Sequence, residues 1–117
     1  MGGLREIIQG LDAGASVKGA AIIGEDGLVI HDALGADADG DAVAALAVTT
    51  LRHAEQLGGA CRSGPLETAV FEFGEGPAIL SALTPNATLV VLAHPHRDLG
   101  PLLHELRIRR DTLTGLL

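Results

Sequence analysis

The sequence has 117 residues, of which 47% are hydrophobic and 2% aromatic, and its formal net charge is −7. The length favours one domain over residues 1–117, and the apolar content excludes a chain that stays unfolded for lack of hydrophobic residues. The acidic balance, with Lys18 as the one lysine, excludes a basic surface for nucleic acid or anionic lipid. Because no apolar run is long enough to insert into a membrane and Cys61 is alone, we expect a cytoplasmic protein.

The N-terminal part of the sequence predicts a short helix and a β-hairpin. Apolar residues recur at helical spacing at Leu4, Ile7, Ile8 and Leu11. Two strands are then predicted, over Val17–Ile23 and Leu28–Asp32. Gly24-Glu25-Asp26-Gly27 lies between them and contains an Asp-Gly pair, which is typical of tight hairpins because both residues tolerate positive φ.

A long helix is predicted from Ala42 to Leu57, and Gly58-Gly59 is expected to end it. Three acidic residues that can cap free amides precede the helix, namely Asp37, Asp39 and Asp41. One helix face is expected to carry Val43, Leu46, Ala47, Thr50, Leu51, Ala54 and Leu57. Small apolar residues also occupy other sides of the helix, so we expect its N-terminal half to be covered on more than one side.

The third part of the sequence predicts an antiparallel meander. Its strands are Leu66–Phe73, Pro77–Leu83 and Thr88–Ala93, and both connections have the composition of turns. Leu89–Leu92 is continuously apolar, which is typical of a central strand covered on both faces. Leu66–Phe73 has apolar residues on both of its faces and needs a cover if it lies at a sheet edge.

Asp98 and Pro101 indicate the start of a last helix, which continues through Leu102, Leu103, Leu106 and Leu113. Arg107, Arg109 and Arg110 lie in its later part, where they can complement the helix dipole or contact an acidic partner. The first role is the commoner one. The element order α-β-β-α-β-β-β-α predicts an α/β (α+β) fold, with a five-stranded, mostly antiparallel sheet flanked by helices on both faces.

Four stretches, in this order, resemble the Roadblock (dynein light chain) family. They are Glu25–Ile30, the Ala/Leu-rich second helix, Ala69–Phe73, and Leu99-Gly100 followed by His104–Arg107. The resemblance covers Val17 to Arg110, although many bacterial relatives look like Arg-Tyr-Glu-Leu-Arg where this chain has Leu103-His104-Glu105-Leu106-Arg107. It implies a non-catalytic homodimer that regulates or scaffolds a Ras-like small GTPase, with second helices packed together and third strands meeting edge to edge.

From this resemblance and the apolar pattern, we expect specific residues at each interface. The dimer interface is expected at Val43, Leu46, Ala47, Thr50, Leu51, Ala54, Phe71 and Phe73. The GTPase is expected to contact the neighbouring polar residues Arg52, His53 and Gln56.

Two clusters of potential metal ligands are incomplete in the sequence. The three aspartates before the second helix imitate the start of a calcium loop, but Ala42 and Val48 stand where that loop needs Gly and Glu. His94 and His96, with His104, lack the carboxylate or cysteine spacing of a zinc site. We therefore expect neither a metal nor a cofactor.

Catalytic motifs are also missing from the sequence. His31 and Asp32 are adjacent on a predicted strand and so face opposite ways. No phosphate-binding loop or Gly-x-Ser-x-Gly motif occurs, so an enzyme is not expected. A small-molecule sensor is the alternative, because a sheet between helices can enclose a pocket, but few aromatic residues are available to line one. A hydrolase using His94, His96 and a carboxylate is least favoured.

Overall fold

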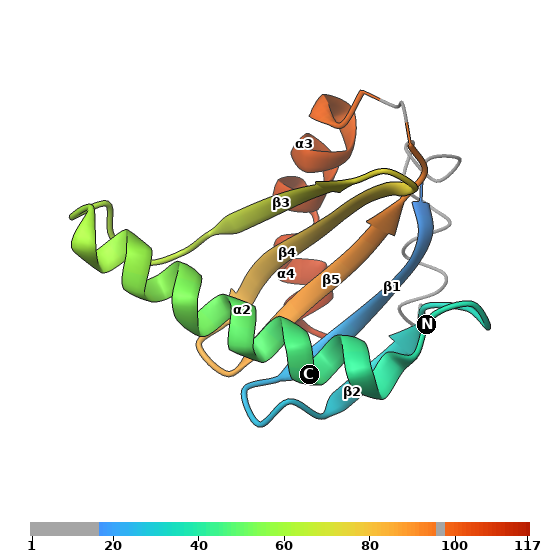
Figure 1. Ribbon diagram of the computed structural model, residues 1–117, viewed down its shortest axis with the longest axis horizontal. Helices are drawn as coiled ribbons and strands as arrows, with labels where there is room; N and C mark the ends of the chain where they lie inside the picture. Colours follow the sequence, from blue (N-terminus) through green and yellow to red (C-terminus); the bar gives the residue numbers. More distant parts are fainter. Residues whose placement is uncertain (1–16, 96–97) are drawn as a thin grey trace.

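The computed structural model describes residues 17–95 and 98–117 (Figure 1). In chain order its elements are β1 (Val17–Gly24), β2 (Val29–Ala33), α2 (Gly40–Ala60), β3 (Thr68–Phe73), β4 (Gly76–Thr84), β5 (Ala87–Ala93), α3 (Gly100–Ile108) and α4 (Arg110–Thr114). The helix predicted at Leu4–Leu11 lies outside the described residues. No helix in the described part of the chain is long and apolar enough to cross a membrane.

The strands form one antiparallel sheet in the order β2-β1-β5-β4-β3. The predicted five-stranded sheet and its meander are therefore confirmed. The central strand is β5, which explains the apolar run Leu89–Leu92. Leu89 and Val91 belong to one hydrophobic core, whereas Val90 and Leu92 belong to or pack against a second core on the other face. At one edge, the register of β1 against β2 shifts between Ile22 and Ile23.

Helices cover both faces of the sheet, as expected, with α2 on one face and α3 and α4 on the other (Figure 1). The core beneath α2 is built from Ile23, Ala44, Ala47, Val48, Leu80 and Val90. The opposite core contains Leu102, Leu106 and Leu113 of the C-terminal helices, packed with Ile22, Ile79, Leu89 and Val91. The two cores share the sheet as a common wall.

Two turns depend on glycine. In the β1–β2 turn, the Gly24 N–H donates to the Leu28 carbonyl over 2.9 Å, so the predicted hairpin is confirmed. Of the Asp-Gly pair only Gly27 takes positive φ, at +81°. In the β3–β4 turn, Gly76 has φ +126°, and a Cβ at this position would lie 2.1 Å from the carbonyl oxygen of Ala93. No other residue fits at Gly76 without moving the backbone.

The helix α2 is longer at both ends than predicted. It begins at Gly40, and Asp39 caps it by accepting the Ala42 N–H at 3.2 Å. The predicted stop at Gly58-Gly59 is wrong, because helical hydrogen bonding continues to the Cys61 N–H and Arg62 is the residue that takes positive φ. Glycine lowers helix propensity by only about 1 kcal/mol, which the flanking residues overcome here.

The buried face of α2 also differs from the prediction. Ala44, Ala47 and Val48 are its buried residues, whereas Leu46 is 68% and Leu57 65% exposed. Small side chains thus face the sheet and two leucines point outward. The physical reason is that alanines allow the helix to approach the sheet closely, and the leucines are on the opposite side of the helix.

The last predicted helix is divided in two. It breaks at Arg109, which ends α3 and precedes α4, so Arg110 begins a helix instead of ending one. The N-cap of α3 is Leu99 and not Asp98. The Asp98 carboxylate still accepts the Gly100 N–H at 2.9 Å, so it orders the turn just before the helix.

We predict that Gly76→Ala destabilises the fold by about 3 kcal/mol, because both its positive φ and its contact with the Ala93 carbonyl must be relieved. Gly74→Ala is the matched control in the same turn, since a Cβ there meets nothing within 4 Å. It should change stability by less than about 0.5 kcal/mol. Urea unfolding measures both values, and equal midpoints for the two variants would contradict this account of the turn.

Candidate functional site

The strand β3 is an unpaired edge of the sheet next to α2. Among residues 17–95 and 98–117 it bonds to β4 alone, so in this part of the chain nothing pairs with the backbone groups on its other side. The side chain of Phe73 is 63% exposed, and its ring stacks on that of Phe71 with centroids 6.5 Å apart. The C-terminal end of α2 projects past the sheet before the chain returns to β3 (Figure 1). The structure therefore exposes two features on this side of the molecule, the edge of β3 and the projecting end of α2.

The structure divides the eight residues predicted at the dimer interface. Half of them pack against or within the core beneath α2 of their own chain, namely Val43, Ala47, Leu51 and Phe71. Ala47 is 7% exposed and has almost no surface to offer a second chain. The others are exposed or half-buried at the surface, namely Leu46, Thr50, Ala54 and Phe73. Leu46, Thr50 and the exposed Leu57 follow one stripe on the outer side of α2, which we call the outer stripe.

The three residues predicted to bind a partner are exposed on the second half of α2. They do not share one surface. His53 follows Leu46 by seven positions and so lies along the outer stripe. Arg52 and Gln56 instead line a groove on the flank of the helix.

This groove, which we call the α2 groove, has a volume of about 760 Å³. Its walls come from α2, the segment before β3, the β4–β5 turn and the start of α4. The apolar part of its lining includes Val48, Leu51, Pro65, Leu66, Leu83 and Pro85. The polar part includes Glu25, Arg52, Glu55, Gln56, Asn86 and Arg110. Sequence reasoning missed the groove because its residues come from separate segments that no motif connects.

Hydrogen bonds fix the walls of the α2 groove. Glu55 Oε1 accepts the backbone N–H of Leu66 over 3.1 Å, which ties α2 to the segment before β3. Glu25 Oε1 accepts from Asn86 Nδ2 at 3.0 Å, and the Glu25 N–H donates to the Asn86 carbonyl at the same distance. The β1–β2 and β4–β5 turns are thereby joined. Both carboxylates of the groove have a structural role.

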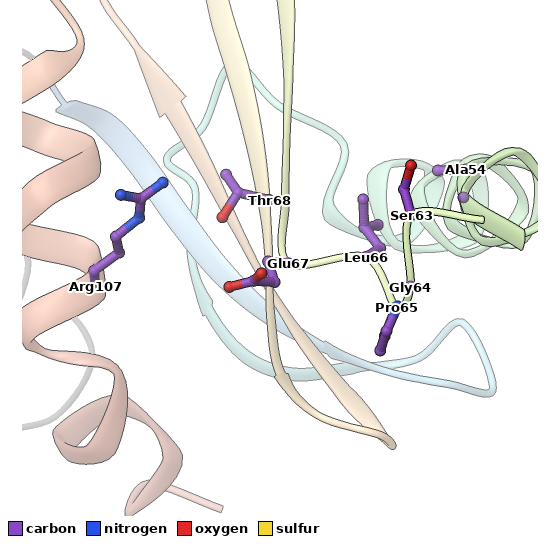
Figure 2. A pocket seen from close by; sticks show the side chains of 9 residues that line it. Ala54, Ser63, Gly64, Pro65, Leu66, Glu67, Thr68 and Arg107 are labelled. Atoms are coloured by element: carbon purple, nitrogen blue, oxygen red, sulfur yellow. The ribbon is translucent and has the colours of Figure 1, made fainter. Parts of the chain in front are cut away.

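A second, smaller hollow of about 260 Å³ lies at the start of β3 (Figure 2). Arg107 reaches from α3 toward Glu67 and Thr68, while Ser63 and Ala54 lie on the far side of the chain segment that leads into β3. The hollow has polar groups of mixed type but no adjacent pair of nucleophile and base among its lining residues.

The titratable residues singled out in the sequence are separated in the structure. Asp39 caps α2, and Asp32 Oδ1 accepts the Leu34 N–H at 2.9 Å. His31 Nε2 lies 3.0 Å from the Leu116 carbonyl oxygen. His96 lies outside the described residues. Within residues 17–95 and 98–117, no three His, Cys, Asp or Glu side chains converge as metal ligands would.

Solved structures of known proteins share this fold. Myxococcus xanthus MglB is 17% identical, with 94% of this chain and 90% of that chain covered and a TM-score of 0.81. A Roadblock/LC7 domain from Streptomyces avermitilis is 29% identical, with coverages of 96% and 99% and a TM-score of 0.69. An MglB described with a tetrameric arrangement is 15% identical, with coverages of 99% and 92% and a TM-score of 0.78.

No curated protein matches this sequence. The family defined by the Roadblock/LC7 domain, in contrast, matches residues 4–93, which include the whole five-stranded sheet and α2. The sheet order, the helices on both faces and the domain match agree, and the chain belongs to the Roadblock/LC7 family.

Proposed function

We propose that this chain is a non-catalytic, cytoplasmic regulator or scaffold that forms a homodimer and binds a Ras-like small GTPase. The observation that carries the proposal is the open edge of β3, with its exposed Phe73, beside a helix that exposes two leucines. Membership of the Roadblock/LC7 family supports a role in GTPase systems, because the family resemblance of the sequence implies one. The likeness to MglB structures supports the fold.

Self-association would remove an energetic liability of the isolated chain. An exposed, apolar edge strand pairs readily with other strands, and stable proteins cover such edges. Antiparallel pairing of β3 with β3 of a second copy would satisfy the open backbone groups around a two-fold axis. Phe73, 63% exposed, and Val70, 39% exposed, would be covered by the same contact. The tetrameric arrangement described for one MglB is further support for self-association within this fold.

The GTPase would dock on the projecting half of α2. Arg52 and Gln56 are exposed on the flank of the helix and His53 on the outer stripe, so a partner that contacts both sides would meet charged and polar groups beside apolar surface. Regulation, as opposed to scaffolding, requires that the GTPase make different contacts in its two nucleotide states. A protein that binds both states with equal affinity does not change the equilibrium between them. A surface that contacts a segment of the GTPase whose conformation differs between the two states would meet this requirement.

A small-molecule sensor is a second candidate, favoured by the volume of the α2 groove. A volume of about 760 Å³ falls in the range of small-molecule sites. The lining contains no aromatic side chain, however, and the groove is open to solvent and does not enclose a small molecule. Protein binding therefore accounts better for the same surface.

We predict that the wild-type chain is a dimer at micromolar concentration and that Val70→Glu with Phe73→Glu makes it monomeric. Unpaired charges buried at the interface should cost about 3 to 5 kcal/mol, which weakens association by at least about 100-fold. Light scattering coupled to size exclusion reports the mass. Ala47 and Leu51 are poorer test sites, because they pack against the sheet of their own chain.

The control for the dimer prediction is Leu28→Glu, which places a charge on an exposed apolar residue of the β1–β2 turn, at the opposite edge of the sheet from β3. It should leave the dimer intact. A monomeric wild-type chain would refute the proposal, and a dimeric Val70→Glu/Phe73→Glu variant would show that β3 is not the interface.

We predict that a small GTPase from the source organism binds the dimer and prefers one nucleotide state. Affinity for the GDP form and for the form loaded with a non-hydrolysable GTP analogue is measured by calorimetry. Arg52→Glu should weaken binding by about tenfold or more, because it reverses the charge of a group expected at the contact. Lys18→Glu, on β1 where Lys18 Nζ donates to the Glu75 carbonyl, makes the same charge change away from the projecting half of α2 and should have little effect. Binding of neither loaded form would exclude GTPase regulation, and equal binding of both would leave a scaffold.

A further inference from the structure

The α2 groove carries arginines from opposite helical layers of the fold. Arg52 comes from α2, and Arg110 is the first residue of α4, which covers the other face of the sheet. Between α2 and α4 the groove passes the β4–β5 turn, where Leu83 and Pro85 contribute apolar surface. A ligand that contacts both arginines must therefore be extended, because it has to reach from one helical layer to the other.

The charged groups of the groove differ in how they are used. Glu25 and Glu55 each accept a hydrogen bond that holds a wall in place. Arg52 and Arg110 form no ion pair and no side-chain hydrogen bond with any residue in the described ranges. Each guanidinium has five N–H donors in a planar fork that matches a carboxylate. The charged groups that remain available to a ligand in this groove are thus the two arginines, although the net charge of the chain is −7.

Arg110 is the more telling of the two arginines because it is only half-exposed. A partly buried guanidinium has lost some hydration, and a carboxylate partner would compensate for that loss better than at a fully exposed site.

We propose that the α2 groove binds a short, extended, acidic segment of a partner protein, with carboxylates that pair with Arg52 and Arg110 and apolar side chains between them. The apolar side chains pack on Leu51, Leu66 and Leu83. Hydrogen-bonded Glu25 and Glu55 limit the number of carboxylates that the groove accepts, so one or two acidic residues fit better than a continuous acidic run. The proposal requires neither a dimer nor a GTPase.

The test starts from a phage-displayed library of 12-residue peptides selected on the full chain. Enriched peptides should contain Asp or Glu next to Leu, Ile, Val or Phe. One enriched peptide is then labelled, and its affinity is measured by fluorescence anisotropy for the wild type, Arg52→Gln, Arg110→Gln and the double variant. Each single substitution should weaken binding by about tenfold, because a hydrogen bond between charged groups is lost. Affinity should also fall as salt is added.

The matched control is Arg62→Gln, which removes an exposed arginine outside the groove lining and should change affinity less than twofold or so. Thermal unfolding checks that each variant is folded, and Arg52, exposed on α2, remains informative if Arg110→Gln is unstable. The proposal is overturned if no peptide is enriched, if enriched peptides are neutral or basic, or if both arginine variants bind as the wild type does.

Light scattering of the same variants separates the proposal from a groove that a second copy fills. The dimer should persist in Arg52→Gln and Arg110→Gln. Loss of the dimer in either variant would show that the groove is an interface between copies, and the acidic segment would then have no place to bind. Because no GTPase is present in these measurements, failure of the GTPase proposal does not affect their outcome.

Discussion

The burial of β5 on both faces is the constraint on which the rest of the structure depends. Leu89 and Val91 contribute to the core under α3 and α4, while Val90 and Leu92 serve the core under α2. Each helical layer is held in place by alternate residues of the same strand. The positions of α2 and α4, and therefore the groove that opens between them and the β4–β5 turn, follow from this shared wall.

The composition of α2 sets how that helix can be used. Its alanines face the sheet and allow close approach, so the burial per residue is small. Leu46 and Leu57, which would bury more apolar area, lie on the opposite side. A helix that buries its small residues and exposes its large ones supports the proposed self-association. The edge of β3 supports the same proposal through its open backbone groups, which could pair with another strand.

The sheet could be predicted from the sequence because local signals determine it. The Asp-Gly turn, the apolar run of β5 and the two-sided β3 each follow from residues that are close in the chain. The end and the buried face of α2 could not be predicted. Two glycines do not stop a helix whose other residues favour helical structure. Because apolar residues lie on several sides of α2, the spacing of apolar residues does not determine which side is buried.

The candidate site was predicted only in part. Arg52, His53 and Gln56 were expected to bind a partner, and Arg52 and Gln56 line the α2 groove. His53 lies instead on the side of the helix that carries Leu46, which was expected at the dimer interface. Arg110 was expected in the later part of one continuous helix, but the helix is interrupted at Arg109 and Arg110 begins a second one. The groove itself depends on how segments distant in the sequence pack together, and residue spacing within one segment does not predict this packing.

The two edges of the sheet are unequal, and this inequality bears on the size of any assembly. If β3 pairs with β3 of a second copy, β2 becomes the strand at both ends of the joined sheet. β2 has five residues, its partner strand shifts register between Ile22 and Ile23, and it carries the exposed Asp32. Shortness, irregularity and charge all discourage further strand addition. The chain would thus terminate its own growth at two copies through the sheet, and larger assemblies would have to form through its helices.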